Sequence, residues 1–145
     1  MTAEPTILVR PVEVERIIDL RHRVLRQGLP REAAVFAGDS APGSIHFAAL
    51  LEEAVVGCAT LHESSFEGQP AFQLRGMAVD PAHQRRGVGR LLLEEAHRLA
   101  GSKPIWANCR TPAVPFYQRF GWRIISDEFV IETAGPHFRM VGMRD

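Results

Sequence analysis

The strongest constraint on the fold lies in the middle of the chain, where three segments predict a strand, a helix and a second strand. An apolar, alternating stretch at 71–79 ends at Asp80-Pro81, and apolar residues then recur at helical spacing through 87–100. A second apolar stretch follows at 105–109. Two strands joined by a helix lie parallel in one sheet, with a right-handed crossover. The chain is therefore predicted to build a sheet with at least one parallel pair of strands.

The flanking segments are short and close together in the sequence, which favours antiparallel pairing. They predict further strands at about 7–10, 45–51, 55–64, 122–132 and 137–143, and further helices at about 11–27 and within 111–121. The prediction is a mixed α/β fold, with one mostly antiparallel sheet of about six or seven strands and about four helices. With 145 residues and no internal repeat or linker, residues 1–145 are expected to form a single domain.

Two glycines, Gly87 and Gly89, stand where the central helix is predicted to begin, directly after the tripeptide QRR. The start of a helix presents unpaired N–H groups and a partial positive charge, and glycine removes side chains that would keep an anion away. Residues 75–90 contain four arginines and one aspartate, a local charge of +3 in a chain with no net charge. This combination predicts a diphosphate site.

Three phosphate-binding motifs compete for this loop. A Walker loop needs Lys followed by Ser or Thr after its last glycine, and neither follows here. A dinucleotide fingerprint needs a third glycine where this chain has Leu92, and its loop directly follows a strand, whereas seven residues separate Val79 from Gly87. The sequence QRRGVG instead fits Q/R-x-x-G-x-G/A, and so resembles the acyl-CoA pyrophosphate loop of the GNAT superfamily of N-acetyltransferases.

The resemblance extends over most of the chain, through the stretches LRGMAV, IWANC and AVPFYQRFGW. It implies a GNAT-like fold in which the strand at 71–79 bulges near Gly76 and splays from the next parallel strand, so that the co-substrate acetyl-CoA lies in the opening. It also implies direct attack of a primary amine on the thioester in a ternary complex. The residues that would contact acetyl-CoA are Met77, Ala78, Val79, Gln84, Arg85, Arg86, Gly87, Val88, Gly89, Arg90, Asn108 and Tyr117.

Tyr117, the only tyrosine, stands in AVPFYQRFGW, where the family usually carries the general acid that protonates the departing thiolate. Packing within a short aromatic helix is the alternative role for this side chain. The general base is less evident, because Gln73 occupies the position at which some members carry a glutamate. Glu63 and His62 on the preceding strand are the candidates, with Glu63 acting through water preferred. Because neighbouring strand residues point to opposite faces, at most one of the two faces the cleft.

Arg21, Gln73 and His137 are the candidates for contact with the acceptor amine. Arg21, Arg23 and Arg26 surround the first predicted helix, a region that closes over the acceptor in the family. We expect these arginines to be solvated, but one that pointed inward would imply an anionic acceptor. His137 stands in AGPHFRM, and similar endings occur in a branch of bacterial acetyltransferases.

Composition argues against several other classes of protein. The formal net charge of zero disfavours a nucleic-acid or membrane-surface partner. Cys58 and Cys109 are isolated in apolar surroundings, and no basic segment followed by an apolar core opens the chain, so a cytoplasmic protein with reduced thiols is expected. The six histidines lack the close spacing of metal sites, so no metal is expected.

The alternative function is a non-catalytic domain of the same fold that binds acyl-CoA, or one that prefers a longer acyl group. The acceptor is expected to be a small-molecule or peptide amine. A monomer and a homodimer are both compatible with the sequence.

Overall fold

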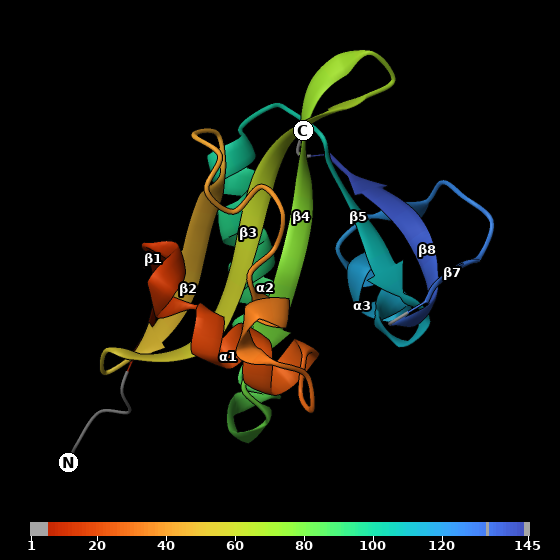
Figure 1. Cartoon of the computed structure of the whole chain (residues 1–145). Helices are drawn as coiled ribbons and strands as arrows, with labels where there is room; N and C mark the ends of the chain where they lie inside the picture. The colour runs from red at the N-terminus through yellow and green to blue at the C-terminus, as the bar shows by residue number, and fades with distance from the viewer. Residues whose placement is uncertain (1–5, 133, 144–145) are drawn as a thin grey trace.

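The structure, a computed structural model, describes residues 6–132 and 134–143 and contains one open sheet flanked by helices (Figure 1). The strands are β1 (Ile7–Pro11), β2 (Ile45–Leu51), β3 (Ala54–Phe66), β4 (Gln69–Val79), β5 (Ile105–Arg110), β6 (Arg123–Ile124), β7 (Phe129–Ile131) and β8 (Gly135–Gly142). Their order in the sheet is β1-β2-β3-β4-β5-β8-β6, and β7 also pairs with β8. Only β4 and β5 pair in parallel among the described strands.

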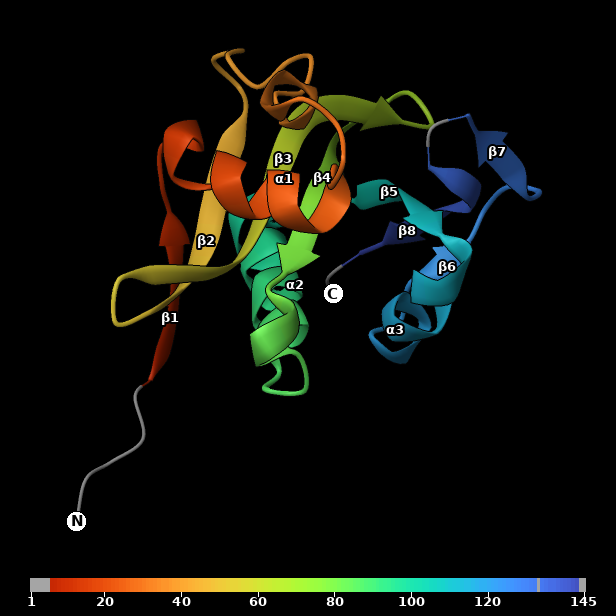
Figure 2. The same ribbon diagram turned by 60° about the horizontal axis from the view of Figure 1, so that its bottom comes forward.

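Three α-helices pack on this sheet: α1 (Ile18–Leu25), α2 (Val88–Ala100) and α3 (Val114–Arg119). Four short 3₁₀ turns lie at Val14–Arg16, Arg31–Ala34, Pro81–His83 and Thr111–Ala113. Helix α1 covers one face of the sheet, and α2 covers the opposite face (Figures 1 and 2). The predicted mixed α/β fold is confirmed, with three α-helices in the described residues where about four were expected.

The first predicted helix is shorter than expected. Over residues 11–27, only α1 is α-helical, preceded by the 3₁₀ turn. Pro11 still lies in β1, opposite Phe47, and the Val12 N–H then donates to the His46 carbonyl at 2.9 Å. Because β1 is an edge strand, it tolerates the missing N–H of Pro11. The chain therefore stays extended where a helix start was predicted.

The single strand expected over 122–132 is also wrong, because the chain forms β6 and β7 with an irregular stretch between them. In that stretch, the Ser126 hydroxyl accepts a hydrogen bond from the Arg139 N–H at 2.9 Å. A side chain thereby takes the place of the backbone partner that a continuous ladder would supply.

Helix α2 is held by the apolar stripe that the sequence predicted. Val88, Leu92 and Ala96 are almost fully buried and belong to the larger core cluster, between α2 and the sheet. A smaller cluster, which includes Ile17 and Leu20, lies under α1 on the opposite face. The sheet is thus buried on both sides in its centre, as expected for a strand pair joined by a helical crossover.

The parallel strands β4 and β5 separate soon after they meet. They pair only at Phe72–Ile105 and Gln73–Trp106, and β4 then bulges, because Gly76 and Met77 together lie opposite one residue of β3. Gly76 has a φ of +63°, and a Cβ atom there would lie 2.8 Å from Cε2 of Phe36. Glycine is therefore required at the bulge. The predicted splay is confirmed and is visible in Figure 1.

Candidate active site

A cleft of about 340 Å³ opens where β4 and β5 part, with residues 73–77 and 107–110 in its walls. On β5, Ala107 and Cys109 are buried in the core cluster on the α2 face. Asn108 and Arg110 alternate with them, so their side chains point to the α1 face. Because residues of both kinds line the cleft, it joins the two faces of the sheet. A ligand on one face can therefore meet a ligand on the other.

Tyr117 reaches the cleft from α3, on the α2 face of the sheet. Only 7% of its surface is exposed, and its ring packs against Phe116 and Trp122 at centroid distances of 5.2 and 4.9 Å. Burial raises the pKa of Tyr117, and the neighbouring Cys109 acts in the same direction. Its hydroxyl has no hydrogen-bond partner among the described residues, although buried tyrosine hydroxyls usually find one. It is thus a protonated donor that a ligand could engage.

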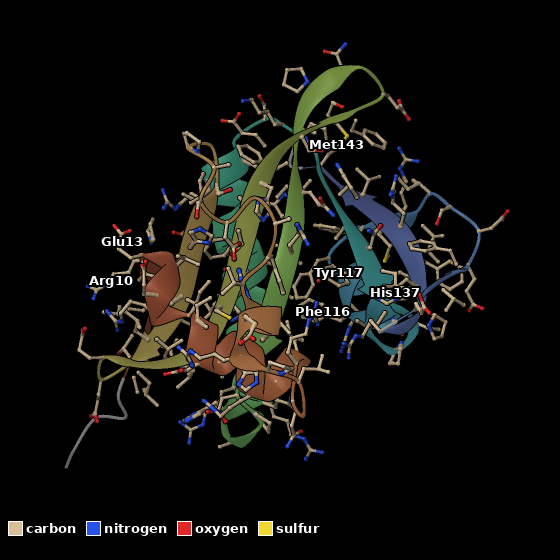
Figure 3. All side chains as sticks on the ribbon, in the orientation of Figure 1. Arg10, Glu13, Phe116, Tyr117, His137 and Met143 are labelled. Atoms are coloured by element: carbon tan, nitrogen blue, oxygen red, sulfur yellow. The ribbon has the colours of Figure 1, made fainter. Side chains whose placement is uncertain are left out.

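His137 lies on β8 and lines the same cleft; Figure 3 shows it and Tyr117 on either side of β5. In the β5–β8 ladder, His137 lies opposite Arg110, and its ring stacks on Phe129 with the centroids 6.0 Å apart. Its Nδ1 lies 2.7 Å from the Gly135 carbonyl oxygen. A carbonyl oxygen only accepts, so Nδ1 carries the hydrogen, and Nε2 of the neutral ring keeps its lone pair. Nε2 is therefore the His137 nitrogen that could accept a proton.

Arg21 is fully buried, which corrects the expectation that the arginines of the first helix are solvated. Its Nη1 donates to Asp39 Oδ2 at 2.7 Å and its Nη2 to Thr60 Oγ1 at 2.8 Å. Burial alone would raise the pKa of Asp39, but hydrogen bonds from Arg21 and the Phe36 N–H lower it overall. Arg21 also lies 3.9 Å over the Phe36 ring. It therefore does not line the cleft but holds Phe36, which does.

The two predicted base candidates lie outside the cleft. His62 shares a face with its cross-strand partner Gln73, yet its Nδ1 turns to the Ser44 hydroxyl at 3.0 Å. Burial lowers the pKa of His62, and the positive charge of Arg75 adds to this effect. Glu63 is exposed and lies against Gly43, away from the cleft. Of the three polar residues predicted along these strands, only Gln73 lines the cleft.

The glycine loop leads into α2 as the sequence indicated. Gly87 is the N-cap of α2 with a φ of +75°, and Arg85 has the same left-handed φ. The first helical bond runs from the Leu91 N–H to the Gly87 carbonyl, so the N–H groups of residues 88–90 have no partner within the helix. A Cβ atom at Gly89 would lie 3.2 Å from the Phe116 ring. A Cβ atom at Gly87 would meet nothing within 4 Å, so the helix start is open beside Gly87 and closely packed beside Gly89.

The other predicted cofactor contacts are divided between cleft and sheet. Met77 and Asn108 line the cleft, and Asn108 Oδ1 accepts a hydrogen bond from Arg139 Nε at 3.2 Å. Ala78 and Val79 pair with β3 and do not line the cleft, although their backbone lies on the edge of β4 that β5 has left. Gln84, Arg86 and Arg90 lie at the start of α2.

Sequence reasoning missed the contribution of Phe36, Arg75 and Arg110 to the cleft. The alternation of β5 could have placed Arg110 on the face of Asn108. The position of Phe36 could not be predicted, because it depends on the contact between Arg21 and Asp39. Among the described residues, no group of three His, Cys, Asp or Glu side chains could hold a metal ion. No helix in the described part of the chain is long and apolar enough to cross a membrane.

Comparison with known proteins decides the family. Residues 42–124 match the family model of the acetyltransferase (GNAT) domain. The chain belongs to the GNAT acetyltransferases. Over 141 residues it is 30% identical to the uncharacterized N-acetyltransferase YitI of Bacillus subtilis (strain 168), covering 91% of this chain and 93% of that protein. The GNAT fold explains the parallel pair, the bulge and the helix start as parts of one arrangement.

Solved structures agree on the GNAT fold. Escherichia coli ElaA superposes with a TM-score of 0.78 at 18% identity, covering 94% of this chain and 99% of that one. An aminoglycoside 6'-N-acetyltransferase complexed with coenzyme A gives a TM-score of 0.75 at 12% identity, covering 94% and 96%. At these low sequence identities, the similarity shows that the fold is shared and nothing further.

Proposed function

We propose that this GNAT domain transfers the acetyl group of acetyl-CoA to a primary amine by direct attack in a ternary complex. The observation that carries the proposal is the cleft through the sheet, with the unpartnered hydroxyl of Tyr117 in its wall. An acyl donor on the α2 face and an amine on the α1 face would meet there. The structure of the aminoglycoside acetyltransferase with coenzyme A supports a coenzyme in this fold.

Acetyl-CoA binds, in this proposal, along the free edge of β4 and at the start of α2. The open N–H groups of residues 88–90 and the positive end of the helix hold the pyrophosphate, aided by Arg85 and Arg86. The pantetheine arm pairs with the backbone of residues 77–79 and reaches Asn108 across the cleft. The N–H near Met77 would face the thioester carbonyl and stabilise the oxyanion of the tetrahedral intermediate.

The amine attacks the thioester directly, without an acyl-enzyme. Burial raises the pKa of both Cys58 and Cys109 to about 12, so neither thiol is readily ionised for nucleophilic attack. The amine nitrogen forms a bond to the carbonyl carbon, and the bond from carbon to sulfur breaks. Tyr117 gives its proton to the departing thiolate. Nε2 of His137 takes one proton from the ammonium group before attack, and we prefer it to Glu63 because His137 lines the cleft. The second amine proton, released as the amide forms, restores the phenol of Tyr117.

Acetyl-CoA binding provides the first test. Gly89→Leu adds a bulky side chain at the helix start and presses on Phe116, so we expect the dissociation constant for acetyl-CoA in calorimetry to rise at least tenfold. Ser102→Leu is the matched control, because it adds the same side chain at an exposed position just beyond the other end of α2. Equal affinity in the wild type and in a folded Gly89→Leu protein would contradict the proposed binding mode.

A further inference from the structure

The α1 side of the cleft is lined by cations. Arg26 at the end of α1, Arg75 on β4 and Arg110 at the end of β5 all line it. No Asp or Glu among the described residues does so. The chain as a whole has 17 basic and 17 acidic residues, so the lining of this cavity is more positive than the protein as a whole. The cavity is therefore a positively charged site within a neutral protein.

These three arginines are also unpaired, within the described residues. Ion pairs are formed by other arginines, namely Arg10, Arg21, Arg23, Arg31, Arg90 and Arg98. Arg75 Nη1 donates to the Ala37 carbonyl at 3.1 Å, and Arg26 Nη1 donates to the Leu25 carbonyl at 2.9 Å. The Arg110 side chain makes no hydrogen bond to another described residue. Most of the guanidinium donors around the cleft are thus free for a ligand.

The fold brings these positive charges close together, where they repel one another. The guanidinium groups of Arg26 and Arg75 lie 4.9 and 5.1 Å from the centre of the Phe36 ring, beside buried Arg21. Burial lowers the pKa of Arg26, as do the positive charges of Arg110, Arg21 and Arg75. Like charges repel unless an anion lies between them. Phe36 therefore lies among three arginines, and Asp39, which forms an ion pair with Arg21, also attracts Arg75. No carboxylate among the described residues forms an ion pair with Arg26 or Arg75.

We propose that the acceptor amine carries an anionic group, a carboxylate or a phosphate, which Arg75 and Arg110 bind with support from Arg26. The proposal rests on the proposed acetyl transfer. Guanidinium groups bind either anion through paired, charge-assisted hydrogen bonds. His137, the cross-strand neighbour of Arg110, then faces the amine of the same molecule. The same charges repel polycationic acceptors, such as polyamines, and so select against them.

Matched acceptor pairs test this inference. β-Alanine and β-alaninamide differ in the carboxylate, and phosphoethanolamine and ethanolamine differ in the phosphate. For at least one pair we expect the amine with the anionic group to have a kcat/KM about 10- to 100-fold higher than its partner without that group. The pair with the larger ratio shows whether the site prefers a carboxylate or a phosphate. In Arg75→Gln and Arg110→Gln, the ratio should fall toward one, because the partner without the anionic group gains nothing from those arginines.

Arg119→Gln is the matched control, since it removes one exposed positive charge on α3 and should keep the wild-type ratio. Equal kcat/KM values within both pairs, in an enzyme that does acetylate amines, would overturn the anionic acceptor and leave acetyl transfer standing. A binding measurement covers the opposite case, in which the anion site exists but acetyl transfer does not occur. If no amine is acetylated, calorimetry with N-acetyl-β-alanine, and a loss of that binding in Arg75→Gln, would support the anion site without the transfer. Absence of binding to the wild type would overturn the site.

Discussion

Replacing Tyr117 by phenylalanine is expected to lower kcat about 100- to 10,000-fold, the usual contribution of general acid catalysis. The KM for acetyl-CoA should change little, because the phenylalanine ring still packs against Phe116 and Trp122. The hydroxyl has no hydrogen-bond partner among the described residues, so its removal should leave thermal stability nearly unchanged. Only the protonation of the departing thiolate is lost. Steady-state kinetics with one good amine measures the effect.

Two comparisons sharpen this test of Tyr117. A donor whose leaving group is a more acidic thiol needs less protonation, so it should lose less rate in Tyr117→Phe than acetyl-CoA does. Phe116→Leu, an aromatic change on the same helix, reports the effect of altered packing alone. A Tyr117→Phe protein with wild-type turnover would mean that the tyrosine serves only the core.

His137→Asn is expected to lower kcat/KM for a protonated alkylamine about 100- to 10,000-fold. Asparagine keeps an N–H donor near the Gly135 carbonyl but offers no basic nitrogen in place of Nε2. An amine that is already neutral at the assay pH, such as an alkoxyamine, should lose much less, because it needs no proton acceptor before attack. The comparison of the two amines in one variant therefore separates proton transfer from structural damage.

Glu63→Gln and His62→Asn provide the controls for His137. Both side chains lie outside the cleft, so both variants should keep rates close to the wild type. A loss in Glu63→Gln, together with a normal His137→Asn enzyme, would transfer the role of base to Glu63 acting through water.

The central unit of the fold was predictable because its signals are local. Periodicity locates α2, and the break after Val79 and the glycine at 87 fix its flanks. The bulge at Gly76 was predictable for the same reason, since a glycine within an apolar strand has few other causes. The hydrogen bond between Ser126 and β8 was not predictable in this way. Nothing local shows that its side chain would replace a backbone partner on β8.

The site was predictable in part. The resemblance to the GNAT family led to Met77, Asn108 and Tyr117, which the fold brings to one cleft. The buried pair of Arg21 and Asp39 was not predictable, because the two residues belong to segments whose contact depends on the whole fold. Strand register likewise decides that His62 shares a face with Gln73, and the sequence does not encode register in any one residue.

The most direct test of acetyl transfer is a single turnover, with the protein in excess over acetyl-CoA labelled in its acetyl group. Phosphoethanolamine or β-alanine is added, and mass spectrometry follows the label. We expect the label to appear in the N-acetylated amine, in an amount equal to the free thiol released, with none attached to the protein. Label that stays in acetyl-CoA with every amine tested, or that accumulates on Cys58 or Cys109, would contradict it.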